Sequence, residues 1–297
     1  MIARLVGSEM CIRDRPMVGH IAETGQIAAV DFREGNTPPS KDNLGFIHLC
    51  QAALPDDVQV TALRIDAAGY QESIIRHCDT QQINYAIRAK MSPTIKALAQ
   101  KIADNQWQPL LDKAGNPTDQ QTYRTVHCIG DYKQAFTLVI QRQVKQGQGT
   151  LALESETSTD EHVAGNFIYR AIATNQETLN DSELVHWYNQ RGEDSENRIK
   201  ELKHDFGGDT LPCSDFKANA LYFALTALAY NLFALLRQLL PEALAHGRAL
   251  TLRHRLYGLA AKVVRSGRQL IFKLQEAHRQ VLTQVLHLIS CFKPPPI

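Results

Sequence analysis

The sequence lacks the short motifs that mark common nucleotide-binding and hydrolytic sites. It has no glycine-rich phosphate loop ending in lysine and no glycine fingerprint of a dinucleotide-binding fold. It also has no nucleophile elbow around a serine and no His-Glu-x-x-His zinc motif. These absences exclude the motif-defined members of those classes. Carboxylates and cations remain as the groups that could carry chemistry.

Paired cysteines are missing as well. The six cysteines include no Cys-x-x-Cys pair, so neither a zinc site nor a disulfide framework is predicted. His127 and Cys128 are neighbours, but adjacent residues of a strand point to opposite faces and cannot share a metal ion. Scattered thiols in a chain of this size indicate a reducing compartment, and we therefore predict a cytoplasmic protein.

The chain has little net charge. Lysine and arginine number 32 against 31 acidic residues, which gives a formal net charge of +1 and no overall preference for nucleic acid. From Pro241 onward, however, nine lysines and arginines face only Glu242 and Glu276. This basic C-terminal segment could contact phosphates, or it could be a solvated surface.

No secretory leader is predicted, because the apolar run at the start of the sequence is short and is followed by charged residues. One longer stretch, Ala218 to Leu236, contains no charge over nineteen residues and is long enough to cross a membrane. Asn219, Thr226 and Asn231 interrupt it. We therefore expect a helix that is buried on most sides in a large α/β core.

The first fifteen residues, MIARLVGSEMCIRDR, show neither the alternation of a strand nor the apolar stripe of a helix. They are similar to a string that recurs at truncated ends of translated sequence assemblies. We therefore predict that residues 1–15 are a non-native leader and that the natural N-terminus has been lost.

Strands and helices alternate over residues 16–104, which predicts an α/β part. The expected strands are Val18–Ala22, Gln26–Arg33, Val58–Ile65 and Ile83–Ala89, and helices are expected from about Ser40 to Pro55, after Asp66 and at Pro93–Ala103. Residues 105–177 instead consist of short alternating runs with turn-rich spacers, which predicts an antiparallel β insertion. Helices return at residues 178–241. The basic segment at residues 242–297 should hold a hairpin turning at Ser266–Arg268 and a helix at Glu276–Cys291.

Asp66 directly follows the strand Val58–Ile65, whose apolar residues lie on both faces and so indicate a central position in the sheet. Ligands of open α/β sheets bind at the carboxyl ends of strands, which makes Asp66 a candidate site residue. An aspartate at this place could equally well cap the following helix.

The charged stretch Trp187–Gly207, WYNQRGEDSENRIKELKHDFG, has no explanation in bulk hydrophobicity. Glu196, Lys200 and Lys203 are four and seven residues apart, so they would share one face of a helix. The pattern is typical of a solvated helix face with Glu-to-Lys pairs. It also fits a metal-binding carboxylate beside cations that hold phosphate, as phosphoryl transfer requires.

Tyr188, Arg191, Glu196 and Lys203 together resemble the Tyr-Arg-Glu-Lys signature of bacterial insertion-sequence transposases of the DDE class. The stretches NRIKELKHDFGGD, IAETGQIAAVDFREGN and LRIDAAGYQ extend this resemblance over roughly residues 16 to 291. The resemblance implies a ribonuclease H-like fold, a mixed sheet flanked by helices, with an antiparallel β insertion before the last catalytic helix.

By the same resemblance, Asp66 and Glu196 are the second and third carboxylates of a triad that binds a pair of Mg²⁺ (or Mn²⁺) ions. Tyr188, Arg191 and Lys203 would contact the transposon-end DNA, and Lys200 is grouped with them. The implied partners are transposon-end and target DNA, with a homodimer assembled on the DNA at the nucleoid. The implied reaction is metal-assisted hydrolysis at the ends, followed by in-line attack of the freed 3′-hydroxyl on target DNA.

The sequence departs from the family pattern in two ways. Four residues rather than three separate Arg191 from Glu196, which requires a kink or a π-bulge at Gly192 if both are to share a helix face. The strand that should carry the first aspartate is replaced by residues 1–15, where Asp14 is a poor substitute, and by resemblance Asp31 is structural. We therefore expect a truncated, catalytically impaired transposase, with a non-catalytic DNA-binding protein or a metal-dependent nuclease of the same fold as alternatives.

Overall fold

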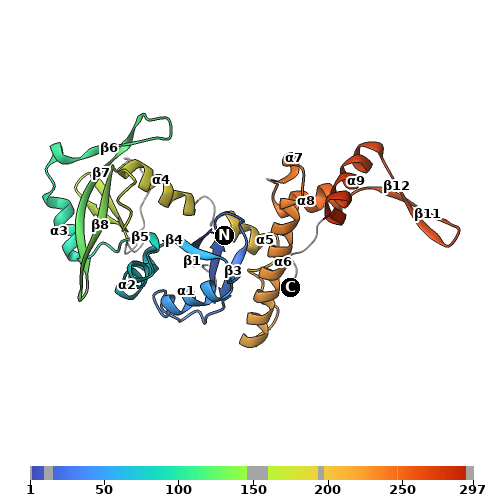
Figure 1. The fold of residues 1–297 in the computed structure, drawn as a ribbon, viewed down its shortest axis with the longest axis horizontal. Coiled ribbons are helices and arrows are strands. Elements are labelled where there is room, and N and C mark those ends of the chain that lie inside the picture. The colour runs from blue at the N-terminus through green and yellow to red at the C-terminus, as the bar shows by residue number, and fades with distance from the viewer. Residues whose placement is uncertain (1, 10–15, 146–159, 193–196, 246, 292–297) are drawn as a thin grey trace. The chain divides into compact units, whose positions relative to one another are not determined.

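The computed structural model describes residues 2–9, 16–145, 160–192, 197–245 and 247–291 (Figure 1). The chain forms two compact units. The N-terminal unit comprises Met1–Glu23 and Ile27–Asn197, and the C-terminal unit comprises Thr24–Gln26 and Arg198–Ile297. The sequence pattern predicts boundaries after residues 104, 177 and 241, whereas the compact units divide between Asn197 and Arg198.

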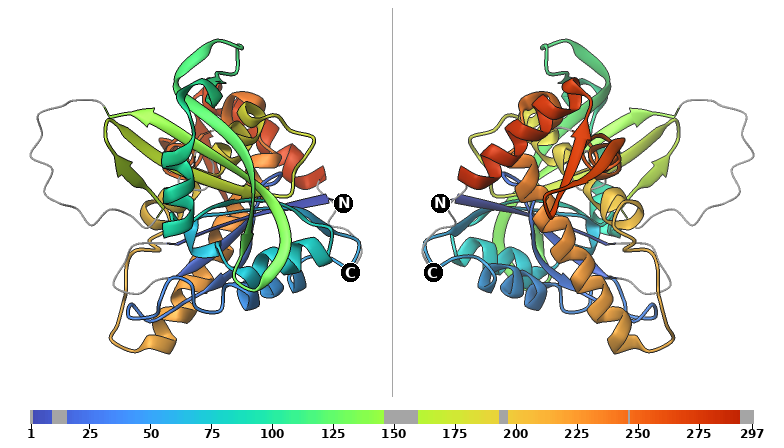
Figure 2. Two further views of the ribbon diagram at one scale, coloured as in Figure 1. Left: turned by 90° about the vertical axis from the view of Figure 1, so that its left-hand side faces the viewer. Right: turned by 90° about the vertical axis from the view of Figure 1, so that its right-hand side faces the viewer.

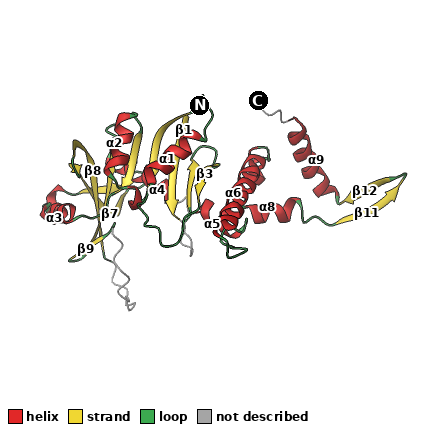
Figure 3. Ribbon diagram, turned by 90° about the horizontal axis from the view of Figure 1, so that it is seen from below, coloured by secondary structure: helices red, strands yellow, loops and turns green. Residues whose placement is uncertain are grey.

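One mixed sheet organises the N-terminal unit (Figure 3). Its first half runs in the order β3-β2-β1-β4-β5, where β1 is antiparallel to β2 and parallel to β4, and β4 is parallel to β5. The strands are β1 (Ile2–Glu9), β2 (Met17–Ile21), β3 (Ile27–Asp31), β4 (Gln59–Ile65) and β5 (Asn84–Arg88). The predicted class, a mixed α/β sheet flanked by helices, is confirmed.

The first residues of the chain differ from the expectation. The sequence pattern predicts that residues 1–15 lie outside the fold and that the first strand is missing, whereas Ile2–Glu9 forms β1 between β2 and β4. The backbone of an extended segment can complete a sheet through its amide and carbonyl groups, which every non-proline residue carries regardless of side-chain pattern. Side-chain periodicity therefore could not reveal this strand.

Antiparallel strands occupy the region of the predicted β insertion, but they continue the same sheet. The strand β10 (Phe167–Thr174) pairs with β5 on one side and with β8 (Tyr132–Val144) on the other. Outside them follow β7 (Pro117–Ile129) and β6 (Gln108–Leu111), and the short β9 (His162–Ala164) pairs with β10. The left view of Figure 2 shows the long, curved β7–β8 ribbon.

Helices cover both faces of this sheet. The helices α1 (Asn43–Ala52), α2 (Glu72–Thr80) and α3 (Pro93–Lys101) contribute to one apolar core, together with inward residues such as Tyr85 and Ile87. Ala86, which alternates with them, points to the other face and packs under α4 (Asp181–Arg191). Asn180 caps α4, because its side chain accepts from Glu183 N at 2.9 Å and the Glu183 carboxylate accepts from Asn180 N at 2.9 Å.

The C-terminal unit is mainly helical. It contains α5 (Asn197–His204, of which Asn197 belongs to the first unit), α6 (Phe216–Gln238), α7 (Glu242–Ala245), α8 (Ala249–Leu256) and α9 (Glu276–Cys291). The hairpin of β11 (Ala261–Ser266) and β12 (Gln269–Leu274) forms a separate two-stranded sheet that extends away from α8 and α9 (Figure 1). The predicted hairpin and the predicted helix at Glu276–Cys291 are both present.

The long apolar helix α6 differs from its expectation. It is long and apolar enough to be a membrane-span candidate by composition, and it is the only such helix among the described residues. The sequence predicts burial on most sides, whereas 39% of its most apolar window is buried. One face packs into the unit, and the opposite face carries exposed leucines.

Candidate active site

Asp66 directly follows β4, so it stands at the carboxyl end of this strand, as predicted. Its side-chain Oδ1 accepts a hydrogen bond from Ala68 N at 3.1 Å and caps the short 3₁₀ helix η1 (Ala67–Gly69). The capping interpretation is therefore correct, and it is compatible with a site at the strand end. The carboxylate is partly exposed at the edge where the parallel strands β4 and β5 end.

Close packing holds the loop after Asp66 in place. A Cβ atom on Gly69 would lie 2.3 Å from Ile65 Cγ2, so only glycine fits at this position. Asn43, at the start of α1, donates from Nδ2 to Ala68 O at 3.0 Å. Arg33 donates to Asn43 Oδ1 at 3.2 Å and pairs with Asp31 at 2.6 Å, which gives Asp31 the structural role expected of it.

An arginine that sequence reasoning missed lies beside Asp66. Ile87 of β5 pairs with Ile65 of β4, so Arg88 and Asp66 occupy neighbouring positions at the same edge of the sheet. The Arg88 side chain is largely buried and approaches Asp160 at 4.0 Å. A lone arginine at the end of an otherwise apolar buried strand was the available signal, because a buried charge needs a partner or a function.

Tyr188 and Arg191 of α4 belong to the same region. Tyr188 is almost fully buried in the core under α4, and its ring is close to two guanidinium groups. The Cζ atoms of Arg88 and Arg191 are 5.1 Å and 5.5 Å from its ring centroid. Tyr188 therefore orients two cations, and its burial leaves little of the ring for direct contact with DNA.

Arg191 is the last residue of α4. Its partly buried guanidinium keeps Nε without a hydrogen-bond partner among the residues that the structure describes. Gly192, the next residue, has the π-helical hydrogen-bond pattern that the extra residue between Arg191 and Glu196 required. Glu196 itself lies outside the described residues.

A second buried arginine fixes α4 on the sheet. Arg64 of β4 is 3% exposed, and its Nη1 donates to the carbonyl oxygen of Trp187 at 2.7 Å. The guanidinium also lies 5.7 Å from the centroid of the Trp187 ring. Because Arg64 is two residues before Asp66, the signature helix and the candidate catalytic strand are held together at one point.

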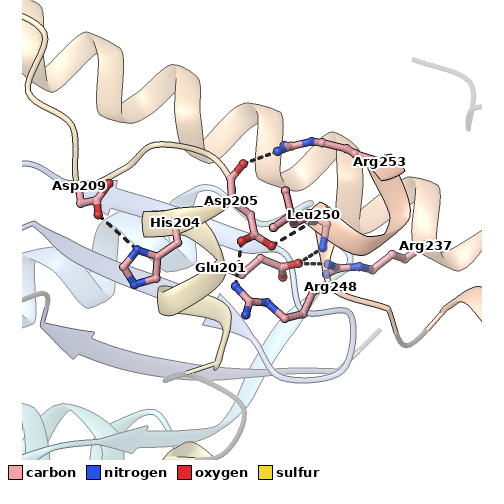
Figure 4. A network of polar contacts seen from close by, with 9 residues as sticks. Glu201, His204, Asp205, Asp209, Arg237, Arg248, Leu250 and Arg253 are labelled. Atoms are coloured by element: carbon pink, nitrogen blue, oxygen red, sulfur yellow. Dashed lines mark hydrogen bonds and ion pairs between the residues drawn. The ribbon is translucent and has the colours of Figure 1, made fainter. Parts of the chain in front are cut away.

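Lys200 and Lys203 lie on α5 of the C-terminal unit, where Lys200 is exposed and Lys203 is partly exposed. Neither forms an ion pair in the described part of the chain. The acidic residues of α5, in contrast, turn inward (Figure 4): Glu201 pairs with Arg237, and Asp205 pairs with Arg248 at 2.8 Å. These two carboxylates therefore hold the unit together, whereas Lys200 and Lys203 have no acidic partner among the residues that the structure describes.

The same two carboxylates bind the start of α8. Glu201 Oε1 accepts from Ala249 N at 2.6 Å, and Asp205 Oδ2 accepts from Leu250 N at 3.1 Å. Arg253 returns from α8 and donates to the backbone oxygen of Asp205 (Figure 4). Carboxylates at a helix N-terminus satisfy its unpaired amides and the helix dipole, so α5 and α8 form one rigid element.

No group of three or more histidine, cysteine, aspartate or glutamate side chains with metal-binding geometry occurs among the described residues. Of the two predicted metal ligands, the structure describes Asp66 only. It supplies one hard oxygen donor of the kind that Mg²⁺ and Mn²⁺ prefer.

A family model described as transposase DDE domain group 1 matches residues 14–293. No curated protein matches the sequence. A solved structure described as the cryo-EM structure of the piggyBac transposase synaptic complex with hairpin DNA is similar at 8% sequence identity and a TM-score of 0.44. The similarity covers 100% of this chain and 55% of that one, so the present chain spans about half the length of that protein.

Proposed function

Because the chain belongs to the family of transposase DDE domains of group 1, we propose that it is a DNA transposase that cleaves at transposon ends and transfers the freed strand to target DNA. The observation that carries the proposal is the position of Asp66 at the carboxyl end of β4, beside Arg88 and the Tyr188–Arg191 pair. A carboxylate next to guanidinium groups suits a site that binds both a cation and a phosphodiester.

The proposed metal ligands are Asp66 and Glu196. Asp66 fits a divalent cation in donor type, since its carboxylate is partly exposed at the open edge of the sheet. A bound Mg²⁺ or Mn²⁺ ion supplies Lewis-acid polarisation of a phosphoryl oxygen and a more acidic bound water.

The cations have a separate task. Arg191 and Lys203 are partly exposed and Lys200 is exposed, and none of the three forms an ion pair in the described structure, so each can neutralise a DNA phosphate. Arg88 and Arg191 both lie close to the Tyr188 ring, which restricts the directions in which the two guanidinium groups point. The guanidinium groups of Arg88 and Arg191 would together hold the scissile phosphate in line with the attacking oxygen.

We propose further that this chain is catalytically impaired, because the place of the first family aspartate holds no aspartate. Gly7 of β1 pairs with Ile65 of β4, so the next residue, Ser8, is level with Asp66. Residues 2–9 contain no aspartate at all. With one carboxylate fewer, the site would offer fewer hard oxygen donors to hold divalent cations.

The test is cleavage of a duplex that contains the transposon end, with Mg²⁺ or Mn²⁺. We expect little or no turnover by the chain and a gain of cleavage on Ser8→Asp. Glu9→Asp is the matched control, because Glu9 is the next residue of the same strand and is not level with Asp66 in the register. Cleavage by the unaltered chain that Asp66→Ala abolishes would refute the impairment. A Ser8→Asp variant that binds end DNA but never nicks it would count against the transposase function.

One observation favours DNA binding without chemistry as a second candidate. Lys262 and Lys273 lie directly opposite each other in the β11–β12 hairpin, where like charges repel unless an anion lies between them. Binding that weakens steeply with salt, without nicking, would support this candidate. Cleavage with no preference for transposon ends would instead indicate a nuclease on the same fold.

The remaining assignments rest on the family. We propose a bacterial insertion-sequence origin, action as a homodimer assembled on DNA, and a location at the nucleoid in the cytoplasm. The buried, unpaired thiols of Cys50 and Cys78 support a reducing compartment.

A further inference from the structure

The exposed face of α6 carries a continuous apolar stripe. Leu221, Leu225, Leu228 and Leu232 are 62%, 55%, 55% and 61% exposed. Their spacing of four, three and four residues is that of a coiled-coil seam. The exposed Ala224 and Ala229 lie between them, and no charged side chain occurs from Ala218 to Leu236.

The opposite face of α6 already has its partners inside the C-terminal unit. Tyr230 and Phe233 pack against Phe206, with ring centroids 5.6 Å and 5.7 Å apart. The Thr226 hydroxyl donates to Tyr222 O at 3.0 Å, one turn earlier. The stripe is therefore a second apolar surface, separate from the core of this unit.

The stripe is symmetric along the helix. Reading outward from the bond between Thr226 and Ala227, Leu225 corresponds to Leu228, Ala224 to Ala229 and Leu221 to Leu232. Two such helices placed antiparallel would therefore set leucine against leucine and alanine against alanine at every level. A two-fold interface requires this self-complementarity, because every contact between residue i of one copy and residue j of the other occurs a second time with the copies exchanged.

We propose that α6 pairs antiparallel with α6 of a second copy of this chain, about a two-fold axis that passes between Thr226 and Ala227. The small alanines beside the axis let the helix backbones approach closely, and the leucines pack on both sides of them. The interface does not depend on the proposed enzymatic function, since it needs neither metal nor DNA.

The exposed area is sufficient for a modest dimer. The four leucines and two alanines present on the order of 500 Å² of apolar surface, which is in the range of patches that mark interaction sites. A pair of copies would bury about 1,000 Å², the lower limit of specific interfaces, so we expect a dissociation constant in the micromolar range.

A membrane is the other occupant that the composition of α6 allows, but its other face argues against it. Asn219 is 5% exposed and donates from Nδ2 to Cys213 O at 2.8 Å, and the Asp215 side chain caps the helix by accepting from Ala218 N at 2.8 Å. A bilayer would require these packed and capped residues to leave the unit. A stripe along one side suits a protein helix and not a surrounding lipid phase.

Sedimentation equilibrium of the full chain without DNA tests the proposal. We expect a monomer–dimer equilibrium at about 1–100 μM, and Leu225→Glu should raise the dissociation constant at least about tenfold. Leu250→Glu on α8 is the control, since Leu250 is similarly exposed at 63% but lies outside the stripe, and it should leave the equilibrium unchanged. A monomeric wild-type chain over this range, or equal effects of the two variants, would overturn the proposal.

A double variant tests the antiparallel direction. Leu225→Glu combined with Leu228→Lys places opposite charges together in an antiparallel pair, so it should dimerise at least about tenfold more tightly than Leu225→Glu alone. In a parallel pair each new charge would meet its own copy, and the double variant would dimerise no better than the single one. Circular dichroism confirms that each variant keeps its helices, and a folded double variant without recovery would refute the antiparallel arrangement.

Discussion

Replacing Glu201 by glutamine should strongly destabilise the C-terminal unit. The Glu201 side chain is 7% exposed, and its Oε1 accepts from both Arg237 and Ala249 N (Figure 4). Glutamine keeps an acceptor for the buried Ala249 amide but removes the charge opposite Arg237, whose side chain is only 18% exposed. Breaking a buried ion pair on one side costs about 3–5 kcal/mol, and a retained neutral hydrogen bond offsets about 1 kcal/mol. We therefore expect a loss of roughly 3 kcal/mol, a central value of these two estimates.

The assay must resolve the C-terminal unit from the rest of the chain. Both tryptophans, Trp107 and Trp187, belong to the N-terminal unit, so tryptophan fluorescence does not report on α5, α6 or α8. Hydrogen exchange followed by mass spectrometry measures the opening free energy of peptides from each helix separately. We expect faster exchange in α5 and α8 together, and unchanged exchange in β4 and β5.

A matched control separates a buried pair from an exposed one. Glu276 pairs with Arg279 on α9 with side chains 63% and 66% exposed, so Glu276→Gln should leave exchange unchanged. If Glu201→Gln behaves like this control, the Glu201–Arg237 pair is solvated in solution and the reasoning from burial is wrong. A loss confined to α8 would instead show that the retained neutral acceptor is a much weaker partner for the Ala249 amide than the carboxylate, and that the ion pair with Arg237 contributes little.

Three further predictions concern the N-terminal unit. Gly69→Ala should cost about 1–3 kcal/mol by overpacking against Ile65, and weaker Mn²⁺ binding measured by calorimetry would show that the Asp66 loop has moved. Burial, with a smaller effect of His48, lowers the pKa of His77 below 6.5, so the unfolded state binds its proton more readily. Urea unfolding should therefore show stability that is present above pH 6.5 and lost as the pH falls through this value towards the folded pKa, with a weaker dependence in His77→Gln. Burial raises the pKa of the Cys50 and Cys78 thiols to about 12, so alkylation at about pH 8 should modify the exposed cysteines first, and equal rates would contradict this burial.

Local elements could be predicted well because their signals lie in short stretches of sequence. The apolar run at Val58–Ile65 corresponds to β4, and the periodicity at Glu276–Cys291 corresponds to α9 with the same bounds. The position of Asp66 at the edge of the sheet could be predicted from the same run, since the end of a buried strand marks that edge. Family resemblance added the signature residues of α4 and α5.

Long-range placement could not be predicted from one sequence. The bond between Arg64 and the Trp187 carbonyl joins residues 123 positions apart, and it depends on backbone geometry that leaves no pattern in the side chains. The outward face of α6 was missed for a related reason, since leucine and alanine are usually buried and an uncharged run gives no sign that one of its sides stays exposed. The strand β1 is likewise recognised from its backbone pairing with β2 and β4, which the side-chain pattern of residues 2–9 did not indicate.

The pairing of β10 with β5 has a consequence for how such a chain can change over evolution. The chain passes Arg88 at the end of β5 and comes back beside it at Ile172 of β10, so the long excursion between them, which extends the same sheet with β6, β7 and β8, begins and ends at one place. An excursion with adjacent ends can lengthen, shorten or be replaced while the strands that bear Asp66 and Arg88 keep their register. Relatives could therefore diverge freely in this excursion without altering the edge of the sheet that carries Asp66 and Arg88.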